Sequence, residues 1–396
     1  MAFRIPLNES TLGPAEIAAA KAVLDGGQLT MAGRVRAFEA EFAAYLGASH
    51  AVMVNSGSSA NLLALSVLAN PLLDGAKRIA PDGEVIVPAL GWSTTVWPVI
   101  QVGAVPVFVD CDPQTLQVRV EDIAAAVTER TCGIVLVHVL GGAVEIDAVL
   151  DLARRHGLWV VEDTCEGLGV RFDGRYIGTF GDIGTYSFYF SHHITTIEGG
   201  MLVTNDDRVA DLARAMRAHG WVRHMQHPER YVAADTDIDP RYLFVTTGFN
   251  LRPTEINAAL GSEQLKRLAG FNERRRAVNA RLLAALAPQI ERGDLTPMRV
   301  SQRIEAAPFG QTVLCRTHEI RNALRDHLEE NGIETRPIIC GNMARQPALG
   351  HLRHRVSGSL AGADKVMDCG LYWGTHPMMT DDQVDYIVSV VQRFFP

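Results

Sequence analysis

Short runs of apolar residues recur between residues 51 and 204, and most are continuous rather than alternating with polar residues. Runs of this kind are typical of strands that are buried on both faces of a sheet. The runs are Ala51–Val54, Val85–Pro88, Pro106–Val109, Ile134–Val137, Leu158–Val161, Thr185–Phe190 and Met201–Thr204. Helix-like stretches, such as Val120–Val127 and Asp147–Arg155, separate several of them. Strands that alternate with helices predict an α/β fold with a mostly parallel sheet, in which ligands bind at the carboxyl ends of the strands.

The pattern changes at Thr254, where a long helical segment begins. Its charged residues 273–276 are expected to form a solvated helix face. A smaller α+β region follows, with predicted strands near Gln311–Leu314 and Ile333–Ile338 and a final helix near Asp381–Phe394. We therefore predict two domains. Residues 1–253 form an N-terminal segment and a large α/β domain, and residues 254–396 form the long helix and a small C-terminal α+β domain.

Composition excludes several classes of function. The net charge of −8 argues against general nucleic-acid binding, which needs a basic surface. The sequence has no apolar run of the roughly 18 residues that a membrane span needs, and it begins without a signal segment. Its six cysteines are scattered and form no CxxC pair, so we expect reduced thiols, a cytoplasmic location and no metal site.

Three short motifs carry polar groups at predicted strand ends. Residues 55–61, NSGSSAN, lie between a strand and a helix, where free backbone N–H groups favour a phosphate. Asp163 ends a strand and is placed to hold a ligand, for example the nitrogen of a pyridine ring. Trp92 follows another strand and is suited to stack on a flat ring. Each motif also has a structural interpretation, as a capped helix start, a helix cap and a core tryptophan.

The segment 187–200, SFYFSHHITTIEGG, is the most informative. Adjacent histidines on a strand point to opposite faces, and no metal-type spacing accompanies His192 and His193. Histidine titrates near neutral pH, so one of them is better explained as an acid–base group that faces a ligand.

The order of these motifs resembles the sugar aminotransferase (DegT/DnrJ/EryC1/StrS) family of fold-type-I pyridoxal-phosphate enzymes, which act on nucleotide-linked keto sugars. The resemblance runs from about Leu7 to the C-terminus. It rests on SGSSAN, GWSTT, VEDTCEG, SFYFSHHITTIEGG, RAHGW and GFNLRPTEINAALG, in that order. It implies the fold-type-I transferase fold, a pyridoxal or pyridoxamine 5′-phosphate cofactor, and a homodimer with shared active sites.

One departure from the family pattern matters more than the match. Family aminotransferases carry, at the position of His192, a lysine that binds the cofactor covalently. The four lysines of this chain, Lys21, Lys77, Lys266 and Lys365, all lie outside that segment. The resemblance therefore points to the lysine-lacking branch, the sugar 3-dehydratases. It implies removal of the C3 hydroxyl of a nucleotide-linked 4-keto-6-deoxy sugar, for which GDP-4-keto-6-deoxy-D-mannose is the expected substrate.

The resemblance also assigns cofactor contacts residue by residue. It places Gly57, Ser58 and Ser187 at the cofactor phosphate, Asn250 of the partner subunit at the same phosphate, Trp92 over the ring and Asp163 at the ring nitrogen. His192 would remove a proton from the C4′ carbon of the cofactor and assist the departure of the C3 hydroxyl. L-Glutamate would regenerate pyridoxamine phosphate, and ammonia would be released. His193 is then expected to be structural, although a part in catalysis stays open.

Weaker candidates and alternatives complete the prediction. His219, Arg252 and Arg336 are candidates for contacts to the substrate or to a carboxylate. A second subclass of 3-dehydratases uses an iron–sulfur cluster, but Cys315, Cys340 and Cys369 are too dispersed to supply its CxC pattern, so we expect no cluster. The alternatives are an ordinary sugar aminotransferase and a catalytically inactive, ligand-sensing or structural member of the fold.

Overall fold

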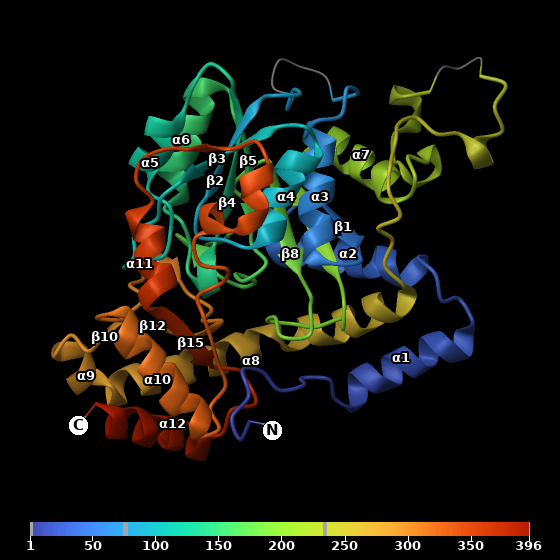
Figure 1. Ribbon diagram of the computed structural model, residues 1–396. Coiled ribbons are helices and arrows are strands. Elements are labelled where there is room, and N and C mark those ends of the chain that lie inside the picture. Colours follow the sequence, from blue (N-terminus) through green and yellow to red (C-terminus); the bar gives the residue numbers. More distant parts are fainter. Residues whose placement is uncertain (1–2, 74–77, 233–235, 396) are drawn as a thin grey trace.

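The computed structural model describes residues 3–73, 78–232 and 236–395, and an eight-stranded sheet forms its centre (Figure 1). The strand order is β1-β9-β8-β5-β4-β2-β3-β14. Neighbours are parallel except where β9 pairs with β1 and β8, which confirms the prediction of an α/β fold with a mostly parallel sheet. The strands are β1 (His50–Val54), β2 (Glu84–Pro88), β3 (Val105–Val109), β4 (Thr131–Val137), β5 (Trp159–Asp163), β8 (Ile183–Ser187), β9 (Gly200–Thr204) and β14 (Arg355–Val356).

The central strands are mostly apolar on both sides because helices cover both faces of the sheet. Val85 and Val87 of β2 face one apolar cluster, whereas Ile86 between them faces a second cluster on the other side. The helices of this domain are α3 (Gly57–Leu68), α4 (Ser93–Gln101), α5 (Val120–Ala126), α6 (Ile146–His156) and α7 (Asp207–Arg217). Because successive residues are buried on opposite faces of the sheet, the apolar runs in the sequence are continuous and do not alternate with polar residues.

The C-terminal elements form a smaller antiparallel sheet of order β10-β12-β15-β13. Figure 1 shows α9, α10 and α12 gathered around it, near both chain ends. The elements are α9 (Ala287–Glu291), β10 (Leu295–Pro297), β12 (Gly310–Cys315), α10 (His318–Glu330), β13 (Thr335–Arg336), α11 (Ala361–Cys369), β15 (Gly370–Gly374) and α12 (Asp381–Phe394). The strand predicted over Ile333–Ile338 is therefore shorter than expected. A third small sheet pairs β6 (Arg171–Phe172) with β7 (Arg175–Tyr176) and with β11 (Ile304–Glu305).

One long helix connects the two regions. Helix α8 (Glu255–Ala285) begins at the capping residue Thr254, and α1 (Pro14–Gly26) and α2 (Gly33–Leu46) pack against it. The N-terminal segment also reaches the C-terminal region, because Ile5 bridges to Ile333 and is buried with its apolar cluster. The division at residue 253 stays a prediction, and these contacts cross it. None of the helices within the described ranges is both long enough and apolar enough to span a membrane.

The expectation of a solvated charged face at residues 273–276 was wrong for Arg275. Its side chain is 1% exposed, and its Nη1 donates a hydrogen bond to the Phe309 carbonyl at 3.1 Å. Within the described part of the chain Arg275 forms no ion pair. Burial lowers the pKa of this guanidinium to about 10. A run of four charged residues on a helix necessarily turns one of them toward the packed side.

Candidate active site

A pocket of about 670 Å³ opens at the carboxyl ends of the parallel strands β4, β5 and β8. This is the position at which an open α/β sheet binds ligands. Residues of the C-terminal region form the opposite wall, among them Arg336, Ile339 and Tyr372. The pocket brings together many of the predicted site residues, namely Gly57, Ser58, Trp92, Asp163, Ser187, His192 and Arg336.

Asp163 lies at the end of β5 and is almost fully buried. Its Oδ2 accepts hydrogen bonds from Asn61 Nδ2 at 2.8 Å and from Thr95 Oγ1 at 2.7 Å. Its neighbour Glu162 does not line the pocket, because adjacent strand residues point to opposite faces. Glu162 instead accepts bonds from the backbone N–H groups of residues 178, 180 and 181. Only Asp163 of this pair is therefore available to a ligand.

The N-terminus of α3 forms the other end of the pocket. Ser56 caps the helix by accepting from the Ser59 N–H, and the first N–H groups of a helix have no acceptor within it. Ser58 Oγ lies 2.9 Å from Thr94 Oγ1, and Ser187 approaches from β8. A Cβ added to Gly57 would lie 2.6 Å from Ser187 Cβ, so this turn requires glycine. Free N–H groups, hydroxyls and the positive end of the helix dipole suit an anion such as a phosphate.

Trp92 is 54% exposed even though it lines the pocket, so it is not the core tryptophan of the structural interpretation. It immediately precedes α4, which also carries Thr94 and Thr95. An exposed indole beside a pocket provides a flat apolar surface for a ring.

His192 projects into the same pocket from the loop between β8 and β9. Its Nδ1 lies 2.7 Å from the Cys165 carbonyl oxygen. A carbonyl only accepts hydrogen bonds, so Nδ1 carries the hydrogen and Nε2 has a free lone pair. Burial lowers the pKa of His192 to about 4, against the opposing effects of the Cys165 carbonyl and the Asp163 charge. At neutral pH His192 is therefore a neutral base that presents Nε2.

His193 turns away from the pocket and is 1% exposed. Its Nε2 donates to the Ala307 carbonyl at 2.9 Å, and burial holds the pKa of this imidazole well below its usual range. The ring packs edge-on against Phe309, as does the ring of His192. This environment supports a structural part for His193. No metal-binding group of histidine, cysteine and acidic side chains occurs within the described ranges.

Three predicted residues lie outside this pocket. Asn250 is exposed, and its Oδ1 accepts from Arg252 Nε at 3.0 Å. Ala218 and Asn250 form an antiparallel bridge, which places His219 beside them. His219, Asn250 and Arg252 therefore form a separate cluster on the loops that follow α7.

Several lining residues were missed by sequence reasoning. Asn61 and Thr95 support Asp163, Phe309 and Tyr372 come from distant segments, and Glu166 follows Asp163 by three residues. Asn61, Thr95 and Glu166 have a sequence signal, since they belong to the motifs SGSSAN, GWSTT and VEDTCEG. Nothing local marks Phe309 or Tyr372, because only the packing of the C-terminal domain brings them to the pocket.

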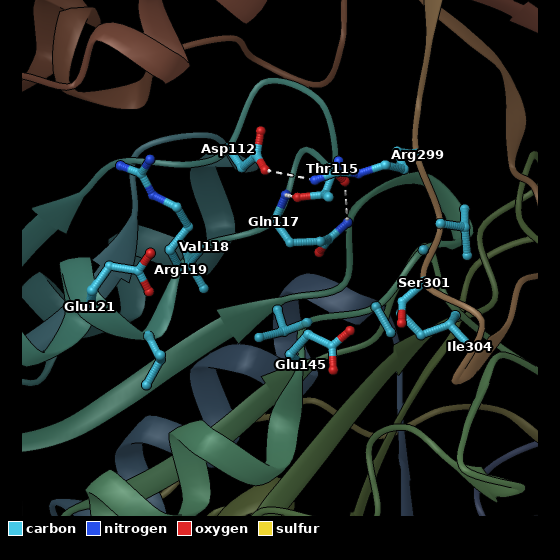
Figure 2. Close-up of a pocket in the computed structure, with 15 residues that line it drawn as sticks. Asp112, Thr115, Gln117, Val118, Arg119, Glu121, Glu145, Arg299, Ser301 and Ile304 are labelled. Carbon is cyan, nitrogen blue, oxygen red and sulfur yellow. Dashed lines mark hydrogen bonds and ion pairs between the residues drawn. The ribbon is translucent and has the colours of Figure 1, made fainter.

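A second pocket, of about 450 Å³, lies beside β3 and the segment 299–304 (Figure 2). Four of its five charged lining residues have ion-pair partners. Arg299 lies 3.6 Å from Asp112, Arg119 bonds to Asp122 at 2.6 Å, and Glu145 pairs with Arg303 at 3.2 Å. None of the predicted site residues lines it.

The donor set of the first pocket fits one kind of molecule. Its groups suit an anion at the start of α3, a flat ring beside Trp92 and a protonated ring nitrogen at Asp163. A phosphorylated heteroaromatic ring combines these features. His192 then supplies an acid–base group where a lysine would supply a covalent link.

Comparisons with known proteins point the same way. A sequence model of the DegT/DnrJ/EryC1/StrS aminotransferase family matches residues 10–392. The chain is 35% identical over 398 residues to the GDP-4-keto-6-deoxy-D-mannose 3-dehydratase of Yersinia pseudotuberculosis, with 99% of each covered. It is 37% identical over 378 residues to the dTDP-4-dehydro-2,6-dideoxy-D-glucose 3-dehydratase of Saccharopolyspora spinosa, with 93% of this chain and 81% of that protein covered. A crystal structure of GDP-4-keto-6-deoxymannose-3-dehydratase with a trapped PLP-glutamate geminal diamine matches with a TM-score of 0.90 and 34% identity, covering 98% of this chain and all of that one.

Proposed function

The chain belongs to the DegT/DnrJ/EryC1/StrS aminotransferase family, and from that premise we propose that it is a pyridoxal-phosphate-dependent 3-dehydratase. It removes the C3 hydroxyl of a nucleotide-linked 4-keto-6-deoxy sugar and yields the 4-keto-3,6-dideoxy sugar. The observation that carries this proposal is His192, which presents a free Nε2 to the pocket where family aminotransferases carry a lysine. Full-length similarity to two 3-dehydratases supports it.

The residues of the pocket would hold the cofactor by non-covalent contacts. Gly57, Ser58 and Ser187 would bind its phosphate, Trp92 would cover its ring and Asp163 would pair with its ring nitrogen. When bound, pyridoxamine phosphate supplies an amine for the C4 carbonyl carbon of the sugar and a ring that withdraws electrons. A carboxylate at the ring nitrogen keeps that nitrogen protonated, and the protonated ring withdraws electrons more strongly.

His192 performs the proton transfers. Its Nδ1–H is held by the Cys165 carbonyl, so Nε2 accepts a proton from carbon and later releases it. An imidazole cannot form the covalent link to the cofactor that a lysine amine forms. The pocket would therefore hold the cofactor by non-covalent contacts alone, and the bound pyridoxamine phosphate would supply the nitrogen that is released as ammonia. L-Glutamate then restores the amine form of the cofactor.

For the substrate we propose GDP-4-keto-6-deoxy-D-mannose. The similarity to the GDP-sugar dehydratase spans 99% of both chains, whereas the dTDP-sugar dehydratase is covered to 81%. Arg336 at the pocket wall is the candidate for a substrate contact from this chain.

We further propose a cytoplasmic homodimer with shared active sites. Asn250, His219 and Arg252 do not line the pocket of their own chain, and a second subunit would bring them to it. Exposed apolar side chains on α1 and on the loops around the site support this arrangement, namely Ile17, Leu24, Tyr189, Ile197 and Phe244. All six cysteines are unpaired thiols, which fits a reducing compartment.

Product analysis tests the proposal. The protein is incubated with pyridoxal phosphate, L-glutamate and the GDP, CDP or dTDP form of a 4-keto-6-deoxy sugar. We expect the GDP form to give a product one oxygen atom lighter, with one ammonia per product. Exchange of the ketone for an amine without ammonia would show an aminotransferase instead. Failure with all three forms, while the protein retains cofactor, would show a ligand-binding protein without this activity.

A further inference from the structure

The ring of Phe309 lies against the imidazole of His192 and lines the same pocket. The two ring centroids are 5.2 Å apart and the ring planes meet at 65°, which is an edge-on contact. Tyr189 makes a second edge-on contact with the imidazole, at a centroid distance of 6.1 Å. The imidazole of His192 therefore has one aromatic neighbour from its own loop and one from a distant segment of the chain.

The hydrogen bond of the His192 ring leaves its tilt undetermined. In the part of the chain that the structure describes, the imidazole forms one hydrogen bond, from Nδ1 to the Cys165 carbonyl. The torsion that turns an imidazole about its Cβ–Cγ bond has broad minima, so this bond holds Nδ1 but lets Nε2 swing. A catalytic atom has to stay within about 0.5 Å of its productive position. Contacts on the faces and edges of the ring must therefore supply the rest of the constraint.

The backbone that carries Phe309 is fastened from several directions. Arg275 Nη1 donates to the Phe309 carbonyl at 3.1 Å, and His193 Nε2 donates to the Ala307 carbonyl at 2.9 Å. The Phe309 N–H donates to the Leu140 carbonyl at 3.2 Å. The ring of His193 also packs edge-on against the Phe309 ring, with centroids 5.7 Å apart. Phe309 thus cannot move away from His192 without breaking these contacts.

Arg275 fastens this segment at a cost in stability. Its side chain is 1% exposed, and no carboxylate pairs with it in the ranges that the structure describes. Burial of a charge without a counter-ion is unfavourable. Burial lowers the pKa of His192, and the positive charge of Arg275 adds to this effect. Residues that break a packing rule in this way are typical of functional sites, so the contact of Arg275 with the Phe309 carbonyl points to function.

We propose that Phe309 is a positioning residue for His192, and that Arg275 and His193 act through it. The edge-on ring contact keeps the imidazole at the tilt at which Nε2 faces the reacting carbon. This inference rests on the proposed function, in which His192 transfers the protons. The adjacent histidines then have complementary parts, because His192 carries the proton and His193 fastens the residue that aligns it.

The kinetic test uses both half-reactions, since the same Nε2 serves dehydration and the conversion of pyridoxal to pyridoxamine phosphate by L-glutamate. Phe309→Leu keeps an apolar side chain but removes the ring. We expect both single-turnover rates to fall by about 10- to 100-fold, because a displacement near 1 Å costs about that factor. The half-saturating concentrations of sugar and L-glutamate should change by less than about threefold, since binding is not what is lost. Phe180→Leu is the matched control and should change neither rate, because Phe180 is also half-buried and edge-on to a phenylalanine but lies outside this pocket.

Nuclear magnetic resonance measures the His192 ring directly, in the full chain with isotope-labelled histidine and without cofactor or substrate. The nitrogen resonances show which ring nitrogen carries the hydrogen, and the signals absent from His192→Asn belong to His192. In the unmodified protein and in Phe180→Leu we expect a single form with the hydrogen on Nδ1. In Phe309→Leu the ring should tilt away from the Cys165 carbonyl, and the resonances should average over both forms.

Several outcomes would overturn the proposal. Unchanged rates in Phe309→Leu would do so, as would slower dehydration alone with a higher half-saturating sugar concentration, which would make Phe309 a sugar contact. Slowing of both half-reactions with unchanged His192 resonances would assign the ring to the cofactor instead.

Two safeguards keep the test decisive. If Phe309→Leu does not fold, Phe309→Met, which fills more of the same space, takes its place, and averaged His192 resonances in the unmodified protein would overturn the proposal without any variant. Absence of dehydration by the unmodified protein would refute the proposed function and leave this test in force, because the glutamate half-reaction and the resonances need no sugar.

Discussion

At the scale of single residues, the adjacent pair His192 and His193 shows how chain neighbours acquire different chemistry. His192 faces the pocket and keeps a free Nε2, whereas His193 points into the protein and donates to the Ala307 carbonyl. Both imidazoles are kept neutral by burial, which lowers their pKa values. Access to the pocket, rather than residue type, therefore separates the acid–base group from the structural one.

Restoring a lysine at this position should change the enzyme's chemistry. We expect His192→Lys to bind pyridoxal phosphate covalently, because the amine can attack the aldehyde carbon and lose water. Borohydride should reduce this link between lysine and cofactor to a stable bond, and mass spectrometry should then show a protein heavier by the mass of the attached cofactor. Dehydration should fall at least 100-fold, since a cofactor tied to lysine is not free to leave its nitrogen with the sugar. His192→Asn is the matched control, which should bind cofactor without a covalent link and also lose dehydration. Dehydration by His192→Lys at the original rate would contradict this explanation of the missing lysine.

Buried histidines should make folding stability depend on pH below neutrality. His376 is fully buried, neither ring nitrogen has a partner in the described ranges, and burial with the charge of Arg275 lowers its pKa to about 4. The unfolded chain takes up the proton near 6.5, so the free energy of unfolding falls as pH drops from 6.5 toward 4. The slope is about 1.4 kcal/mol per pH unit for each such histidine. Urea titrations of His376→Gln at several pH values should show a smaller slope, while exposed His351→Gln should keep the original one.

At the scale of elements, the turn into α3 depends on close packing. A Cβ on Gly200, the first residue of β9, would lie 2.3 Å from the Ser56 carbonyl oxygen. The backbone of β9 therefore touches the capping residue of the helix whose N-terminus is the proposed phosphate site. The second glycine of the Gly-Gly pair in the sequence motif serves this contact, which no local rule of turn chemistry predicts.

Two glycine substitutions should change the free energy of unfolding in opposite directions. Gly200→Ala should force the turn at Ser56 away from β9, lower the free energy of unfolding by about 1–3 kcal/mol and weaken pyridoxamine phosphate binding. Gly270→Ala lies in an exposed part of α8 with no atom within 4 Å of the added Cβ, and should raise the free energy of unfolding by about 0.5–1 kcal/mol. Urea titration and calorimetric binding measure both. Equal stabilities for the two variants would show that the packing at Ser56 is not tight in solution.

The elements were predictable to the degree that their signal is local. Strands β2, β3 and β4 are marked by apolar runs, and α8 by its length and its cap at Thr254. Strand β14 is two residues long and forms only because Arg355 meets Val107 of β3, so no local pattern marks it. The burial of Arg275 likewise depends on the segment that carries Phe309. For the site, Asp163 and His192 stand at positions that the sequence motifs mark, whereas Phe309 and Tyr372 reach the pocket only through packing between distant segments.

At the scale of the whole molecule, one chain places its site residues in two groups. The pocket holds His192 and Asp163, and a separate exposed cluster holds Asn250 and Arg252. If the second group serves the pocket of a partner, each functional site needs one part from each chain.

Mixed dimers test this arrangement. We expect His192→Asn and Asn250→Ala proteins to be weakly active alone. After unfolding and refolding together they should recover about one quarter of the unmodified activity, because half of the dimers are mixed and each has one complete site. Mixing His192→Asn with Asp163→Asn should recover none, since both residues line the pocket of the same chain and mixed dimers then have no complete site. No recovery in the first mixture would assign Asn250 to its own chain.

Strand β14 also has a consequence for how the protein folds during its synthesis. The ribosome makes the chain from its N-terminus, so β3 is completed long before Arg355 and Val356 pair with it. Until then β3, which is apolar along its length, is the open edge of the nascent sheet. The eight-stranded sheet therefore cannot be completed as soon as residues 50–204 have emerged. It must wait for residues 355–356, and during that interval the exposed edge is a site for chaperones or for aggregation.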